Sequence, residues 1–98
     1  MAVRRAQRLE ERKPRVAASF GNDTETLRTV AQVLELLELA WHDVYGEVTP
    51  PEEVVDDVLL CSEGTLAGLV AAARLAVIDR RDLDVWASEI RRRATRPA

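Results

Sequence analysis

The chain has 98 residues, of which 47% are hydrophobic and 32% charged, and its net charge is −3. These values are typical of one globular domain, and the chain is long enough for only a modest hydrophobic core. Because a small domain buries a smaller share of its surface than a large one, we expect self-association to add stability.

The charges are segregated along the chain. Residues 1–20 include six basic and two acidic residues, residues 21–90 four basic and fifteen acidic residues, and residues 91–98 four basic residues and no acidic ones. The net charges of the three segments are therefore +4, −11 and +4. We expect residues 1–20 to form a basic arm, flexible or partly helical, that is attracted to the acidic body. The arginines of this arm are Arg4, Arg5, Arg8, Arg12 and Arg15.

A first helix is predicted over residues 23–45. Asn22 or Asp23 supplies its N-cap, and Gly46 ends it. Apolar residues recur at three- and four-residue steps, and three further apolar residues widen the stripe beyond one face. These three are Val33, Leu36 and Ala40. We expect two neighbours to cover so broad a stripe, and the candidate interaction residues on this helix are Leu36, Trp41 and Tyr45.

A second helix is predicted over residues 50–60. Thr49 is placed as its cap, with proline in the first turn and Glu52 at capping-box spacing. The valines and leucines of this helix are expected to face inward. Its acidic residues, which we interpret as a solvated outer face, are Glu52, Glu53, Asp56 and Asp57.

A third helix is predicted over residues 63–78, with Ser62 as its cap. Arg74 is its only charged residue between Thr65 and Ile78, so we expect this helix to be the central and most buried one. It is too short to span a bilayer. Small residues recur on it every four positions, at Gly64, Gly68, Ala72 and Ala76, and such a ridge allows close helix packing. The alternative is that composition alone produced the ridge, because alanine favours helices.

A fourth helix is predicted over residues 80–92, capped by Asp79. The predicted fold class is therefore all-α, a small antiparallel bundle of about four helices (23–45, 50–60, 63–78 and 80–92) with a basic N-terminal arm. We divide the chain into the arm at residues 1–20, a helical domain at residues 21–92 and a short basic tail at residues 93–98.

Candidates for catalysis or metal binding are few. The single histidine limits such a site to Glu35, Glu38 and His42, which are spaced by three and four residues on the wet side of the first helix. A metal site in a helical bundle needs matching ligands from other helices, and the sequence supplies none. We therefore interpret these residues as surface residues and predict no catalytic residue, no metal ligand and no cofactor.

Cys61 and Ser62 lie at the junction of the second and third helices. Because Cys61 is the only cysteine, an intrachain disulfide is excluded, and we expect a buried packing residue in a cytoplasmic protein. Ser62 resembles the attachment serine of the acyl carrier proteins in its place at the start of a helix of a small acidic protein. The surrounding Cys61-Ser62-Glu63 differs from their Asp-Ser-Leu, which makes a carrier the least favoured function.

The arginine-rich ends leave nucleic-acid association open as an alternative. Such binding would be sensitive to salt and independent of sequence, and the acidic body would oppose it. The second and third helices do not suit a DNA-reading pair, because the third lacks the basic and polar residues of a recognition helix.

We therefore predict a noncatalytic protein-protein interaction or regulatory module, with a homodimer as the first candidate and another protein as the other possible partner. The alternatives are a nucleic-acid-associated protein using its arginine-rich tails, and a small carrier or metal-dependent enzyme. No membrane partner is expected.

Overall fold

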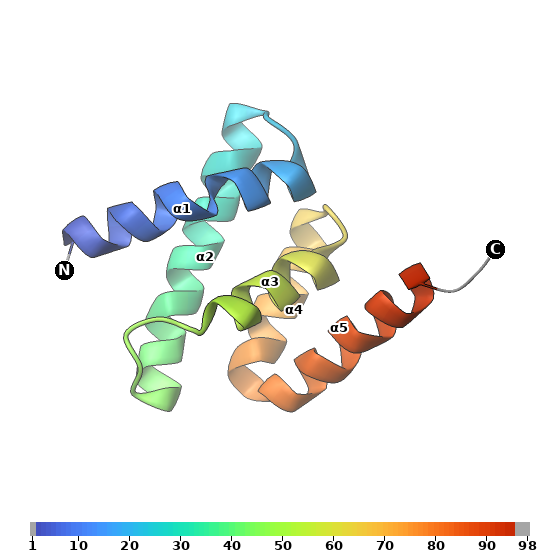
Figure 1. The fold of residues 1–98 in the computed structure, drawn as a ribbon. Helices are drawn as coiled ribbons and strands as arrows, with labels where there is room; N and C mark the ends of the chain where they lie inside the picture. The colour runs from blue at the N-terminus through green and yellow to red at the C-terminus, as the bar shows by residue number, and fades with distance from the viewer. Residues whose placement is uncertain (1, 96–98) are drawn as a thin grey trace.

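The computed structural model describes residues 2–95, with side chains from residue 5 onward. This part of the chain forms five helices and no strand (Figure 1): α1 (Ala2–Phe20), α2 (Thr24–Tyr45), α3 (Glu52–Ser62), α4 (Leu66–Ile78) and α5 (Arg80–Thr95). The all-α class and the bundle of about four helices are confirmed. The segment predicted as an arm adds a fifth helix, α1. The side chain of Arg4 and residues 96–98 of the predicted tail lie outside the described residues.

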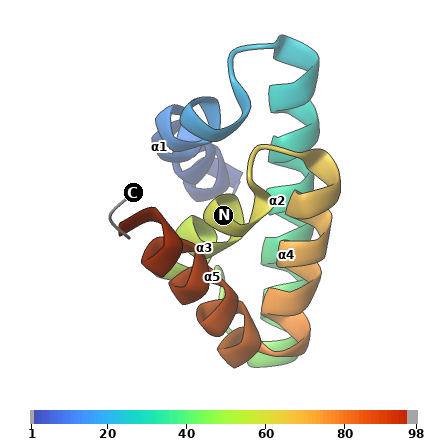
Figure 2. The same ribbon diagram turned by 90° about the vertical axis from the view of Figure 1, so that its right-hand side faces the viewer.

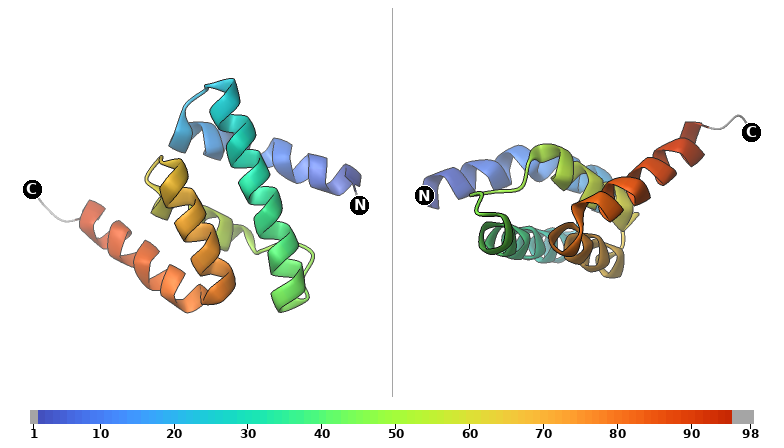
Figure 3. Two further views of the ribbon diagram at one scale, coloured as in Figure 1. Left: turned by 180° about the vertical axis from the view of Figure 1, so that it is seen from behind. Right: turned by 90° about the horizontal axis from the view of Figure 1, so that it is seen from below.

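The helices form two layers. Figure 2 shows α2 and α4 together on one side and α1, α3 and α5 on the other. Seen from behind, α2 and α4 lie side by side and run in the same direction (Figure 3). The hydroxyl group of Tyr45, at the end of α2, donates to the carbonyl oxygens of Ala76 and Val77 near the end of α4, at 3.2 and 3.1 Å. This pair is therefore parallel, as the first and third helices of an antiparallel bundle are, because α3, in the other layer, carries the chain back between them.

The helix ends agree with the sequence at two of the four predicted caps. Asp23 accepts a hydrogen bond from the backbone N–H of Thr26 at 2.9 Å, and Asp79 accepts from the backbone N–H groups of Arg81 and Asp82 in the first turn of α5. The other two caps were predicted wrongly. Thr49 makes no cap and instead binds a side chain of α2, while Ser62 belongs to the last turn of α3 and Thr65 caps α4.

The most buried helix is α3 and not α4, which corrects the prediction for the apolar third helix. Seven of the eleven residues of α3 are buried, compared with four of the thirteen residues of α4. Each of the two helices contacts three others, α3 contacting α1, α4 and α5, and α4 contacting α2, α3 and α5. The difference is that one side of α4 remains exposed, at Val70 and Ile78. None of the five helices in residues 2–95 combines the length and the hydropathy needed for a transmembrane segment.

Candidate interaction face

The outer surface of the α2 and α4 layer is a shallow apolar groove of about 340 Å³. We call it the α2–α4 face. Its side chains come from both helices, and Arg74 is the only charged group among them. They are Val33, Leu36, Leu37 and Ala40 of α2 and Val70, Ala73, Arg74, Val77 and Ile78 of α4.

Several large apolar side chains on this face are open to solvent. Leu36 is 64% exposed, Val70 53% and Ile78 62%. A single exposed apolar residue is normal on a protein surface, but these three border one groove that joins two helices. A contiguous apolar patch of this kind is typical of a surface that binds another molecule.

Of the interaction residues predicted on α2, only Leu36 lies on this face. Trp41 is fully buried, and its indole Nε1 donates to Glu47 at 2.9 Å. Tyr45 packs beside it with ring centroids 4.2 Å apart and is held to α4 by its hydroxyl group. Trp41 and Tyr45 therefore stabilise the chain's own fold, because the helical stripe that contains them turns toward the core.

The small residues of the third predicted helix also make contacts within the chain. Ala72 and Ala76 are fully buried. Gly64 precedes α4, in the turn, where a β-carbon would lie 2.7 Å from the Ser19 carbonyl oxygen of α1. A β-carbon on Gly68 would overlap the Ser62 carbonyl oxygen. The four residues thus serve the packing of α4 against the rest of the chain.

The contribution of α4 to the face was not predicted from the sequence. Val70, Val77 and Ile78 were treated as part of a buried helix, although the near absence of charge on α4 was the signal that could have indicated them. A helix that is apolar all round is buried either by its own chain or by a partner. The sequence does not distinguish these two cases.

The arginines of α1 bind acidic side chains of α2 and α3. Arg8 forms a bidentate ion pair with Glu38, with nitrogen-oxygen distances of 2.6 and 3.1 Å. Arg12 bridges Glu38 at 3.1 Å and Glu52 at 2.8 Å. Further contacts join Arg5 to Glu35 and Glu38, Thr49 to Glu38, and Arg15 to Glu52 and Asp56. We call these residues the α1 ion-pair cluster.

Two members of this cluster, Arg12 and Glu38, are buried. Burial by itself raises the pKa of Glu38, but the hydrogen bonds from Arg8, Thr49 and Arg12 outweigh it, so this pKa lies below the ordinary value. The hydrogen bond from Arg12 is the largest cause of the lowered pKa of Glu52. Both carboxylates are therefore ionised at neutral pH, as an ion-pair network requires.

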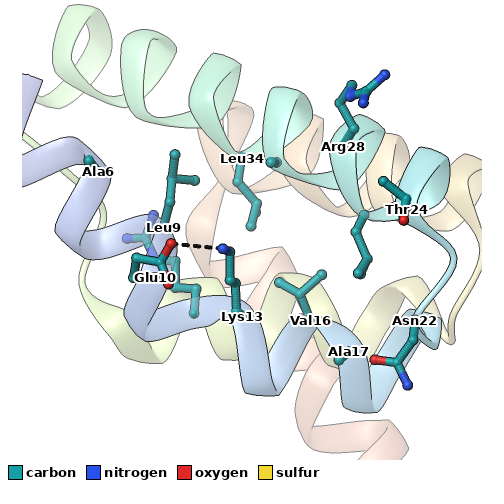
Figure 4. Close-up of a pocket in the computed structure, with 13 residues that line it drawn as sticks. Ala6, Leu9, Glu10, Lys13, Val16, Ala17, Asn22, Thr24, Arg28 and Leu34 are labelled. Carbon is teal, nitrogen blue, oxygen red and sulfur yellow. Dashed lines mark hydrogen bonds and ion pairs between the residues drawn. The ribbon is translucent and has the colours of Figure 1, made fainter.

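A second hollow, of about 590 Å³, lies between α1 and α2 (Figure 4). Leu9, Val16 and Leu34 line it, and Lys13 pairs with Glu10 at 2.7 Å beside it. These two charges neutralise each other, and the other charged side chains that line the cleft are Arg12, which is paired with Glu38 and Glu52, and Arg28. We assign it no role in binding.

The predicted cluster on the wet side of α2 is not a site. Glu38 is buried and turned to α1, which corrects its assignment to the surface, while His42 is exposed and Glu35 pairs with Arg5 at 3.5 Å. The three groups therefore do not converge. In the described part of the chain, no three histidine, cysteine or acidic side chains come together as metal ligands would.

Ser62 is buried as well, and its hydroxyl group donates to the Leu59 carbonyl oxygen at 2.6 Å and accepts from the Gly64 N–H at 3.2 Å. A carrier serine must be reachable by the enzyme that modifies it. The position of Ser62 therefore gives no support to the carrier alternative.

Cys61 is buried, and this burial raises the pKa of its thiol to about 11. Because only the thiolate reacts with alkylating agents, we expect the folded protein at neutral pH to react with iodoacetamide far more slowly than the urea-unfolded chain does. Mass spectrometry over time measures both rates. Equal rates would contradict the buried position of this thiol.

Comparisons of the chain with protein-family models, with curated proteins and with solved structures found no match.

Proposed function

We propose that this protein is a noncatalytic interaction module that forms a homodimer through the α2–α4 face. The observation that carries the proposal is the exposure of Leu36, Val70 and Ile78 along one groove. Removing apolar surface from water is the main favourable term in most protein association. A second copy presents the same apolar face, so each copy can cover the other.

The nucleic-acid alternative has less support than the charge pattern suggested. Arg8, Arg12 and Arg15 are occupied by acidic side chains of their own chain, and Arg91 binds Asp57 at 2.6 Å. Paired arginines contribute little to the phosphate contacts that drive such binding. A cytoplasmic setting is part of our proposal, and the lone, buried Cys61 supports it.

Replacing Leu36 by glutamate tests the proposal. We expect the wild-type protein to be a dimer at tens of micromolar. The dimer dissociation constant of the variant should be at least about 100-fold higher than that of the wild type. The reason is that a twofold interface loses the buried leucine twice and places a charge in each gap. Sedimentation equilibrium or light scattering measures the mass against concentration.

Val85→Glu is the matched control. Val85 is 65% exposed, close to the 64% of Leu36, but it lies on α5 in the other layer and does not line the groove. This variant should dimerise like the wild type. At concentrations low enough for all three proteins to be monomeric, both variants should have the wild-type melting temperature. A monomeric wild-type protein at tens of micromolar, or equal effects of the two substitutions, would contradict the proposal.

A further inference from the structure

The two edges of the α2–α4 face have charges of opposite sign. On the α4 edge, Arg74 is exposed and is the only charged residue of that helix. No ion pair joins it to a carboxylate of residues 5–95. On the α2 edge, Asp43 follows Leu36 by seven residues, so the two lie on the same side of the helix. Its side chain is 86% exposed.

These two charged residues lie at similar heights along the face. The hydroxyl group of Tyr45 contacts the carbonyl oxygens of Ala76 and Val77, so α2 and α4 end close to the same level. Asp43 precedes Tyr45 by two residues, and Arg74 precedes Ala76 by two residues. Each copy therefore presents one cation and one anion at the same level on opposite edges.

This inference rests on the proposed homodimer and specifies its arrangement. We propose that α2 of each copy packs against α4 of the other, around a twofold axis parallel to these helices, and that Arg74 of each copy pairs with the partner's Asp43. A rotation about such an axis keeps every residue at its height and exchanges the two edges. The cationic edge of one copy then meets the acidic edge of the other, twice in each dimer.

The other twofold arrangement that joins the faces has its axis across the helices. It packs α2 on α2 and α4 on α4, and therefore brings edges of the same sign together. Like charges facing each other across an interface disfavour that arrangement. The charges thus select one of two arrangements that bury similar apolar surface. A second copy has the same two edges, so it supplies a complementary charge to each of them.

A pair of single variants tests the arrangement between chains. In a dimer of Arg74→Glu, both contacts become acid against acid, and in a dimer of Asp43→Arg both become base against base. In the mixed dimer, the acidic side chain of Arg74→Glu faces the basic side chain of Asp43→Arg in the partner. The second contact joins the unchanged Asp43 of the first chain to the unchanged Arg74 of the second. Both contacts of the mixed dimer therefore join opposite charges.

We expect each variant alone to dimerise about tenfold more weakly than the wild type, and the equimolar mixture to recover wild-type affinity. Both effects should shrink at about 1 M salt, where charges are screened over a few ångströms. Labelling one variant and titrating it with the other in a fluorescence-anisotropy experiment measures the mixed dimer. Because Arg74 and Asp43 are exposed, we expect both variants to fold, and their melting curves check this.

The outcomes separate the two proposals. If Leu36→Glu breaks the dimer but the mixture associates no better than either variant alone, the face is the interface and the arrangement proposed here is wrong. Unchanged affinity of both single variants would overturn the arrangement in the same way. If the wild-type chain is monomeric, the proposed function fails, and this inference fails with it.

Discussion

Replacing Glu38 by glutamine is expected to lower the free energy of unfolding by about 3 kcal/mol, because it leaves buried arginine charge without its partner. Glu38 is 4% exposed and receives hydrogen bonds from Arg8, Arg12 and Thr49. Glutamine keeps the size of the side chain but removes its charge. Arg12 then retains only Glu52 as an ionised partner, which places the expected cost near the lower end for a broken buried pair.

Glu35→Gln is the matched control for this prediction. Glu35 lies on the same helix, one turn before Glu38, and pairs with Arg5 at 3.5 Å, but both side chains are about half exposed. An exposed pair contributes little, so we expect a change within about 0.5 kcal/mol. Urea unfolding followed by circular dichroism measures both variants. Equal losses for the two substitutions would show that burial of Glu38 has no energetic consequence.

The same variants can be compared as the pH is lowered. The pKa of Glu38 in the folded protein lies below its ordinary value, so its ionisation stabilises the fold above the pKa of an unfolded glutamate, about 4.3. That contribution is lost as the pH falls through the lower, folded-state pKa. The difference in stability between the wild type and Glu38→Gln should therefore be constant near neutral pH and decrease below about pH 4.

The attraction between the basic ends and the acidic body was predictable, but its partners were not. Net charges of +4, −11 and +4 indicate that the segments attract each other. Helical periodicity placed Glu38 on the wet side of α2, because it treats every charged residue as solvated. The crossing of α1 over α2 decides that Glu38 is buried, and no local pattern encodes that crossing.

The acidic side of α3 shows the same difference between pattern and fold. We predicted it to be solvated, and Glu53 is indeed exposed. Glu52 and Asp56 are bound by arginines of α1, and Asp57 by Arg91 of α5. The two basic ends of the chain therefore hold α1 and α5 on either side of α3. The sequence indicates the charges, whereas the topology decides which of them meet.

The apolar character of α4 was predictable from the sequence, but its exposure was not. Periodicity identifies a helix without a polar face. It does not show how many sides of that helix the rest of the chain covers. In the structure, α3 takes the central place and Val70 and Ile78 remain on the surface. Both residues are exposed because α2 and α4 form an outer layer with no third layer above it.

Replacing Gly68 by alanine is expected to destabilise the protein by about 1–3 kcal/mol, although alanine is the better helix former. An added β-carbon would overlap the Ser62 carbonyl oxygen and lie 2.7 Å from Oγ1 of Thr65. Neither group can easily move. The Thr65 hydroxyl group donates to that same carbonyl at 3.1 Å and accepts from the Gly68 N–H at 3.0 Å, which fixes the turn between α3 and α4.

Ala71→Gly, at an exposed position on the same helix, is the control and should cost up to about 1 kcal/mol through helix propensity alone. If Gly68 were on an open face, Gly68→Ala would stabilise the protein by a similar amount, so the sign of the change is decisive. Because the close contact lies within one chain, the dimer dissociation constant of Gly68→Ala should equal that of the wild type at temperatures where both are folded. Thermal unfolding and sedimentation equilibrium on the two variants measure these quantities, and a more stable Gly68→Ala would show that the turn has room for a methyl group.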